Sequence, residues 1–290
     1  MEDMLLPSPF EDIEGIAGSG KDQKEARASI QKPILPHGEE LNDIQLHGTT
    51  TLSFKFSGGI IVAADSRASM GQYVSSRTVK KILPVSKHII ATMAGGAADC
   101  TQFIRMTAAN MRILEMNMGL EPRVRTVAKL FASQMRNNRG SNLSVGTMMS
   151  GYDEIEGFSI YYLDSEGTCV EGDVFCVGSG QALAYAVVDG ALKKCRGIVD
   201  GVNNDDYEVD VDKDDGVYGL RLNRNKNEEE CVEMSVDKAV EVAVQAIRQA
   251  TYRDSYSGGY INVFHIDEHG ARHVYREDSR KVPLGQGRRS

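Results

Sequence analysis

The chain has 290 residues, of which 41% are hydrophobic and 26% charged, values ordinary for a soluble globular protein with one large or two small domains. The net charge of −8 argues against non-specific nucleic-acid binding, and no apolar run approaches the roughly 20 residues of a membrane span. No secretory signal is expected. The five cysteines are scattered and form no Cys-x-x-Cys motif: Cys100, Cys169, Cys176, Cys195 and Cys231. We therefore predict no metal site and a location in the reducing cytoplasm or nucleus.

Residues 1–48 differ from the rest of the chain in composition. They contain four of the seven prolines, and their ten acidic and four basic residues give a net charge of −6. Such composition is typical of a disordered tail. A removable propeptide over 1–48 is the second interpretation, and it depends on Thr49 rather than on the tail itself.

The pattern becomes strand-like directly after this tail. Apolar and polar residues alternate over 51–56, a turn follows at 57–59, and residues 60–64 are apolar throughout, which predicts a strand buried on both faces. Another strand is expected over 88–94, ending in a loop of small residues. Helices are expected over 97–116, with Asp99 in the first turn, and over 123–137.

The second half of the chain repeats this order of strands followed by helices. Strands are expected over 143–151, 158–164 and 168–174. Helices are expected over 181–194 and 236–251, the latter capped by Ser235, and a closing hairpin over 260–275. These segregated blocks predict an α+β protein with two stacked sheets and a helix pair on each outer face.

A small set of residues could together cleave an amide bond. Thr49 offers a hydroxyl nucleophile, Asp65 a carboxylate, Lys81 an ammonium, and the glycine-rich loop at Gly95 a backbone oxyanion site. No histidine-based arrangement supplies a general base. An amino-terminal threonine could use its own α-amine as the base. That amine exists only if the bond between Gly48 and Thr49 is cut, so we predict a precursor that cleaves itself.

Each of these residues also has an ordinary structural explanation. Asp65 after a strand is usually a turn cap or a surface ion pair, and a single lysine is usually solvated. Ser179, between two glycines, is typical of a loop. Only the joint occurrence of these residues favours a catalytic site.

Several motifs resemble the catalytic β subunits of the proteasome, a family of N-terminal nucleophile hydrolases. The resemblance runs from residue 47 to about 275, apart from one block. It rests on GTTTL at 48–52, VAADSRA at 62–68, TVKK at 78–81, TMAGGAADC at 92–100, YLDSEG at 162–167 and ATYRDSYSGG at 250–259.

The resemblance implies a four-layer αββα sandwich and a threonine endopeptidase that cleaves after large apolar residues during ubiquitin-dependent degradation. Thr49 would be the nucleophile, with Asp65 and Lys81 as its partners and Gly95 as the oxyanion donor. Ser179, Asp254 and Ser257 would surround the terminal amine. The residues implied to bind substrate are Ala68, Ser69, Val79, Met93 and Ala97.

The resemblance also implies where and with what the chain works. The expected partners are other α and β subunits in stacked rings and an unfolded polypeptide substrate, with no cofactor, nucleic acid or membrane. The expected location is the cytoplasm and nucleus. Residues 49–290 would form the hydrolase domain.

One block, at about 196–234, departs from the family. Within it, residues 200–233 carry twelve acidic and four basic side chains, a net charge of −8. The run at 210–216 suggests a calcium loop, but Asp215 occupies its glycine position and Arg221 the position of its bidentate glutamate. An acidic, solvated insertion and retained non-coding sequence are the two interpretations.

Two rival functions use the same fold. One is a structural ring subunit without activity, which would have no reason to keep Gly48, Thr49, Asp65 and Lys81 together. The other is a self-processing hydrolase of small amides, against which the Met93 loop and the run at 252–254 argue.

Overall fold

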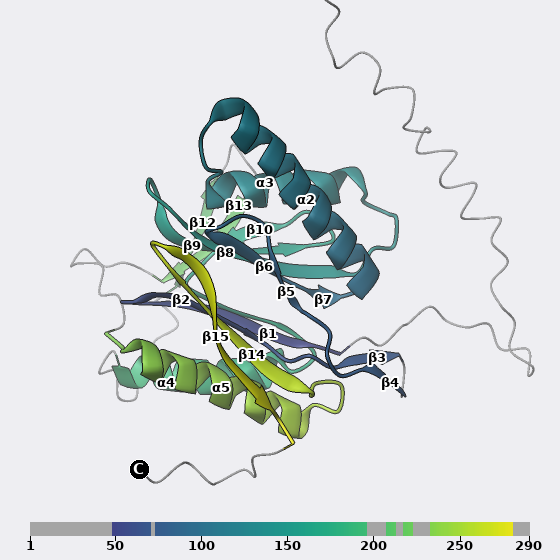
Figure 1. The fold of residues 1–290 in the computed structure, drawn as a ribbon, viewed down its shortest axis with the longest axis vertical. Coiled ribbons are helices and arrows are strands. Elements are labelled where there is room, and N and C mark those ends of the chain that lie inside the picture. The colour runs from purple at the N-terminus through teal and green to yellow at the C-terminus, as the bar shows by residue number, and fades with distance from the viewer. Residues whose placement is uncertain (1–47, 71–72, 196–206, 213–216, 223–232, 281–290) are drawn as a thin grey trace, which may run out of the picture. The chain divides into compact units, whose positions relative to one another are not determined.

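The computed structural model describes residues 48–70, 73–195, 207–212, 217–222 and 233–280, and Figure 1 shows their ribbon. The first sheet begins directly after Thr49. Strands β1 (Thr50–Phe56) and β2 (Gly59–Ala64) pair antiparallel across the predicted turn. Three more strands complete this sheet: β11 (Val174–Gly178), β14 (Tyr260–Asp267) and β15 (Gly270–Asp278). The order of the strands is β11-β1-β2-β14-β15, and every neighbouring pair is antiparallel.

Helices α4 (Gln181–Cys195) and α5 (Val236–Arg253) pack on one face of this sheet (Figure 1). Phe54 of β1 and Ile247 of α5 are fully buried in the same apolar cluster. Burying each such side chain contributes about 1.5–3 kcal/mol. The predicted cap is confirmed, because Ser235 Oγ accepts a hydrogen bond from the N–H three residues along at 3.3 Å.

The second sheet has the order β10-β9-β8-β6-β5, with β7 paired to β8. Its strands are β5 (Ile82–Pro84), β6 (Ile89–Thr92), β7 (Ala94–Gly95), β8 (Val145–Asp153), β9 (Gly157–Asp164) and β10 (Cys169–Glu171). Helices α2 (Ala97–Met118) and α3 (Val124–Asn137) cover it, and the core between them includes Phe131 and Met149. Helix α2 runs two residues beyond its predicted end, to the left-handed residue Gly119 at φ 65°.

The two sheets meet through a third apolar cluster. Ile60 and Val62 of β2 lie in it with Ile90 and Ile160 of the second sheet. Ser53 adds a polar contact, since its Oγ lies 2.8 Å from the Oγ of Ser150. These contacts explain why every residue of β2 is buried, as its unbroken apolar run predicts. The α+β class is confirmed.

The prediction of a single strand over residues 168–174 is wrong. The chain breaks at Gly172 and Asp173, so that β10 pairs with β9 in the second sheet while β11 pairs with β1 in the first. Lys55 holds the crossing point, because its N–H donates to Asp173 O at 2.9 Å and its Nζ lies 3.1 Å from Asp173 Oδ1. One run of strand-forming residues is therefore divided into two strands, one in each sheet.

The structure adds short elements that the sequence did not predict. Strands β3 (Ala68–Met70) and β4 (Tyr73–Ser76) form a hairpin between β2 and β5. Within the acidic block, β12 (Tyr207–Asp212) pairs with β13 (Val217–Leu222), which lies beside β10. The side chains of this block, its calcium-loop motif and the leader before residue 48 fall outside the described residues. No described helix is both long and apolar enough to cross a bilayer.

Candidate active site

Thr49 is held at the start of β1, where the chain enters the first sheet. Its side chain and backbone are only 6% exposed. The neighbouring pair Thr50 and Gly178 closes the ladder between β1 and β11. Gly178 has φ of 117°, and a Cβ there would lie 2.0 Å from Thr49 O, so only glycine fits. The end of β11 therefore fixes the backbone of Thr49.

Asp65 and Lys81 form a buried ion pair beside this strand. Asp65 follows β2 and is fully buried, and Lys81 precedes β5 and is 4% exposed. Lys81 Nζ lies 2.6 Å from Asp65 Oδ1, and the same oxygen accepts the N–H of Thr50 at 3.0 Å. The carboxylate thus joins the ammonium to the residue next to Thr49.

Asp65 is itself fixed by two more backbone donors. Its Oδ2 accepts the N–H of Arg67 at 3.2 Å and that of Gly258 at 2.9 Å. With four donors, the carboxylate has its oxygens fully used and a single orientation. Burial lowers the pKa of Lys81, while the negative charge and hydrogen bond of Asp65 oppose that shift. The negative charge of Asp254 acts in the same direction as that of Asp65, so two carboxylates favour the charged form of this buried lysine.

A hydroxyl network surrounds the nitrogen of Thr49. The Thr49 N–H donates to Ser179 Oγ at 3.1 Å. Asp254 Oδ2 accepts from Ser179 Oγ at 2.5 Å and from Ser257 Oγ at 2.6 Å. Because Ser257 gives its proton to Asp254, it accepts from Thr50 Oγ1, 2.7 Å away. The structure therefore brings together the three residues predicted to lie around the terminal amine.

Gly48 occupies a space with no room for a side chain. A Cβ at this position would lie 1.6 Å from Tyr256 Cβ and 2.8 Å from Tyr256 Cα. The N–H of Gly48 points to Ser69 Oγ at 3.4 Å, a long hydrogen bond. The residue on the other side of the predicted cleavage bond is thus held between β3 and the loop after α5.

Gly95 has the backbone conformation expected of a close-approach site. Its φ is 102°, and a Cβ would lie 2.5 Å from Ser144 O. The next N–H along, of Gly96, donates to Ser144 O at 2.7 Å and so is already used. The role of the Gly95 N–H as oxyanion donor stays a prediction.

Only part of the predicted substrate pocket is brought together. Val79 packs against the apolar cluster that contains Met93, and the Met93 N–H donates to Lys81 O at 2.9 Å. Met93 is 6% exposed and also accepts from Thr101 Oγ1 at 3.5 Å. Among the described residues, Ala68 and Ser69 in β3 and the exposed Ala97 at the start of α2 lie outside this cluster.

Three contacts at the site were not predicted from the sequence: the Thr50 hydroxyl, the Tyr256 backbone against Gly48, and Ser66. Ser66 Oγ donates to Arg77 O at 2.5 Å and accepts the Tyr260 N–H at 2.7 Å, fixing the turn after Asp65. The sequence offered one indication that Thr50 takes part in the site, which is its position next to Thr49.

The described residues contain no group of three or more His, Cys, Asp or Glu side chains that could hold a metal ion. Cys100, Cys169 and Cys176 are free and buried, while the side chains of Cys195 and Cys231 lie outside the described part.

Comparison with known proteins identifies relatives over most of the chain. The family model described as proteasome subunit matches residues 46–195. Proteasome subunit beta type-5 of Gallus gallus is 37% identical over 242 residues, covering 83% of this chain and 79% of the relative. Proteasome subunit beta type-5-A of Arabidopsis thaliana is also 37% identical, covering 87% and 81%. Proteasome subunit beta type-8 of Homo sapiens is 36% identical, covering 80% and 71%.

Proposed function

The chain belongs to the proteasome subunit family, and on this premise we propose that it is a catalytic subunit of the proteasome core, a threonine endopeptidase acting in protein degradation. Its nucleophile is the hydroxyl of Thr49, freed when the bond after Gly48 is cut. The preferred substrates are unfolded polypeptides with a large apolar residue before the scissile bond, the chymotrypsin-like preference.

One observation carries this proposal: the buried pair of Asp65 and Lys81 tied to the N–H of Thr50. Removing two charges from water costs more than their attraction commonly returns, so such a pair is weak support for stability. A structural subunit gains nothing from keeping it beside a buried threonine. A catalytic subunit gains a fixed ammonium next to its nucleophile.

The mechanism follows from the groups around Thr49. After processing, its α-amine has an ordinary pKa of about 7.7–8.0, and a nearby ammonium lowers that value and leaves more of the amine neutral. The amine takes the hydroxyl proton as the oxygen attacks the substrate carbonyl. The amine proton then passes to the leaving nitrogen, and water hydrolyses the resulting ester. Ser179 stands beside the amine nitrogen and orients the proton transfer.

Gly95 is proposed to stabilise the oxyanion formed in both steps. Its positive φ leaves the backbone open to a carbonyl from the substrate side. A lost donor of this kind typically costs about 2.7–4 kcal/mol in the barrier.

Self-cleavage uses the same hydroxyl on a different carbonyl. The Thr49 oxygen attacks the Gly48 carbonyl, the peptide bond breaks, and the acyl group moves from nitrogen to oxygen. Water then hydrolyses that ester, releasing residues 1–48 and leaving Thr49 with a free amine. The Thr49 nitrogen is an amide before this step, so the proton must go to a water molecule or a neighbouring side chain.

The wider context is proposed from the same family membership. The packing of a helix pair on each of two facing sheets supports the four-layer αββα fold of N-terminal nucleophile hydrolases. The partners are other proteasome subunits, in the stacked rings of α and β subunits, and the location is the cytoplasm and nucleus. The alternative, a non-catalytic ring subunit, has no observation in its favour.

Replacing Thr49 tests the proposal directly. In assembled particles whose other active subunits are blocked, Thr49→Ala should leave no cleavage after apolar residues and keep the leader attached. Thr49→Ser should be processed but turn over more slowly, because without the β-methyl group χ1 is freer. Unchanged peptidase activity in the Thr49→Ala particle would overturn the proposal.

A further inference from the structure

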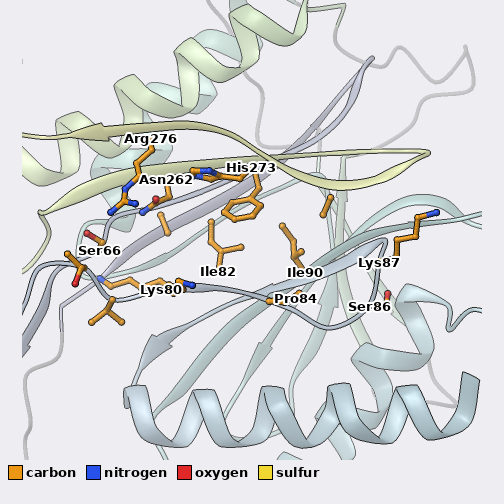
Figure 2. A pocket seen from close by; sticks show the side chains of 16 residues that line it. Ser66, Lys80, Ile82, Pro84, Ser86, Lys87, Ile90, Asn262, His273 and Arg276 are labelled. Atoms are coloured by element: carbon orange, nitrogen blue, oxygen red, sulfur yellow. The ribbon is translucent and has the colours of Figure 1, made fainter.

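A cavity of about 420 Å³ opens on the side of the molecule where β5 approaches β14 and β15 (Figure 2). Of the described residues named at the active site, Val79, Lys81 and Ser66 also help to line it. Thr49, Asp65 and Ser179 do not. The cavity is therefore a separate space that shares one wall, residues 78–82, with the catalytic centre.

The middle of the cavity is apolar and belongs to both sheets. Ile82 and Ile90 are 7% and 3% exposed and lie between its two ends in Figure 2. Phe264 and Ala271 add partly buried apolar surface from β14 and β15. The volume lies in the range of pockets that hold drug-sized molecules, about 300–1,000 Å³. Burying the apolar surface of a ligand against these side chains would be favourable.

The charge of the lining has one sign. It contains Lys80, Lys81, Lys87 and Arg276, and no aspartate or glutamate is among the described lining residues. Asp65 already pairs with Lys81. Neither Lys80 nor Arg276 makes an ion pair with any residue that the structure describes. The cavity thus offers positive charge that the described chain does not neutralise.

One end of the cavity carries a guanidinium beside an amide. The Arg276 guanidinium lies over the ring of Tyr260, with Cζ 4.4 Å from the ring centroid. Asn262 is its cross-strand partner, and both side chains lie at the same end of the cavity in Figure 2. A guanidinium fork beside an amide matches the two oxygens of a carboxylate. A phosphate dianion would leave a charged oxygen facing the apolar middle.

We propose that this cavity is a second binding site for an organic anion with a carboxylate on an apolar body. The carboxylate lies at Arg276 and Asn262, and the apolar body covers Ile82 and Ile90. Two sources have this chemistry: a free aliphatic or aromatic acid, and the carboxyl end of a peptide that finishes in an apolar residue.

Binding should be measured separately from peptidase activity, so that failure of the site and failure of the proposed function can be told apart. The probe is 4-phenylbutyrate carrying a photoreactive diazirine, applied to assembled particles that contain the full chain. Mass spectrometry should place its adducts on peptides containing Ile82, Ile90 or Phe264. The matching amide, which lacks the charge, should label these peptides far less.

Variants at the anion end sharpen the test. Arg276→Gln should lower labelling about tenfold or more, the loss expected for a hydrogen bond to a charged group, and Asn262→Ala should lower it less. Arg272→Gln is the matched control, because Arg272 lies on the same strand, is exposed and pairs with Asp267 instead. Both arginines are on the surface, so folding should be unaffected.

Competition identifies the source of the ligand. Displacement of the probe by N-acetyl-Leu-Phe acid, but not by its amide, would assign the site to peptide carboxyl ends. Displacement by unlabelled 4-phenylbutyrate alone would assign it to small free acids. Equal labelling by acid and amide, adducts outside the cavity, or full labelling in Arg276→Gln would overturn the proposal.

Discussion

Asp65 is the residue through which the candidate site is assembled. It accepts hydrogen bonds from the Lys81 ammonium and from the backbone N–H groups of Thr50, Arg67 and Gly258. Those donors come from four separate parts of the chain. A change at any of them therefore alters the position of the ammonium relative to Thr49.

Lys81 should be required at both chemical steps. Lys81→Ala should abolish processing and hydrolysis, and Lys81→Arg should also be poor, because a planar guanidinium does not replace a compact ammonium in a buried site. Removing one member of a buried pair also costs about 3–5 kcal/mol of stability, so particle yield must be measured beside activity. The exposed neighbour gives the control: Lys80→Ala should be processed and active without added ligand.

The pH dependence follows from the direction of the Lys81 pKa. Burial lowers it from the ordinary 10.5, so the ammonium is lost at a lower pH than for a free lysine. The charged form is penalised by folding, so this residue costs stability below its folded pKa, and the cost disappears above 10.5. Peptidase activity should fall on the alkaline side with an apparent pKa below 10.5. A rate that stays constant up to that pH would contradict the role of the ammonium.

Gly48 should tolerate no larger residue. In Gly48→Ala the new Cβ would meet the Cβ and Cα of Tyr256, and backbone cannot move away cheaply, so processing should slow and precursor should accumulate. Gly190→Ala is the control, because an added Cβ at that helical position would meet no atom within 4 Å beyond its chain neighbours and the nearby backbone of its own helix. Quantitative mass spectrometry of precursor and mature chain measures both. Normal processing in Gly48→Ala would show that this contact does not hold the cleavage bond.

Substrate preference should respond to Ala97, which begins α2 beside the glycine loop. Ala97→Val should raise KM for peptides with a large apolar residue before the cut bond, because it narrows the proposed pocket. Ala98→Val changes an equally exposed neighbour and should leave KM unaltered. A panel of fluorogenic peptides measures the effect. Preference for arginine or aspartate at that position in the unmodified chain would contradict the assignment.

Sequence patterns correctly predicted those strands and helix ends that are determined by residues close together in the chain. The apolar run 60–64 became the fully buried β2, and Ser235 capped α5. Residues 168–174 look like one strand because a strand in either sheet has the same buried pattern. Only pairing with distant strands shows that the chain changes sheets at Gly172.

The same limit applies to the candidate site. A lysine in an isolated sequence is usually solvated, and nothing near Lys81 in the chain reports that Asp65, sixteen residues away, will bury it. The fit of Gly48 against Tyr256 joins residues more than two hundred positions apart, so no local spacing could predict it. The family motifs identified these residues because they report such long-range contacts indirectly.

The acidic block joins α4 to α5 and should be dispensable for catalysis. Replacing residues 200–233 with a short Gly/Ser turn removes β12 and β13, of which β13 lies beside the edge strand β10. It should still leave processing and peptidase activity intact, because so polar a composition is expected to bury little apolar area. Met234 must be kept, since its N–H and carbonyl both bond to Ser57 Oγ, at 3.3 and 3.2 Å. Native electrophoresis and peptidase assays measure the result. Failure of the shortened chain to enter the particle, or ordering of the segment by calcium, would contradict this view.

For the whole molecule, the proposed mechanism makes processing and catalysis depend on a single hydroxyl, that of Thr49. On this proposal the leader is cut only after β11, Asp65 and the Ser179 network have positioned Thr49. A chain supplied as residues 49–290 with a free amino-terminal threonine should bypass the processing role of Lys81. It should still need Lys81 to hydrolyse peptides.

The intact mass of this subunit, taken from assembled and active particles, shows where the mature chain begins. We expect the mass of a chain that begins at Thr49, and a Thr49→Ala chain that does not begin at residue 49 in particles whose other active subunits are blocked. An active particle whose subunit keeps residue 48, or normal cleavage between residues 48 and 49 in the Thr49→Ala chain, would contradict this expectation.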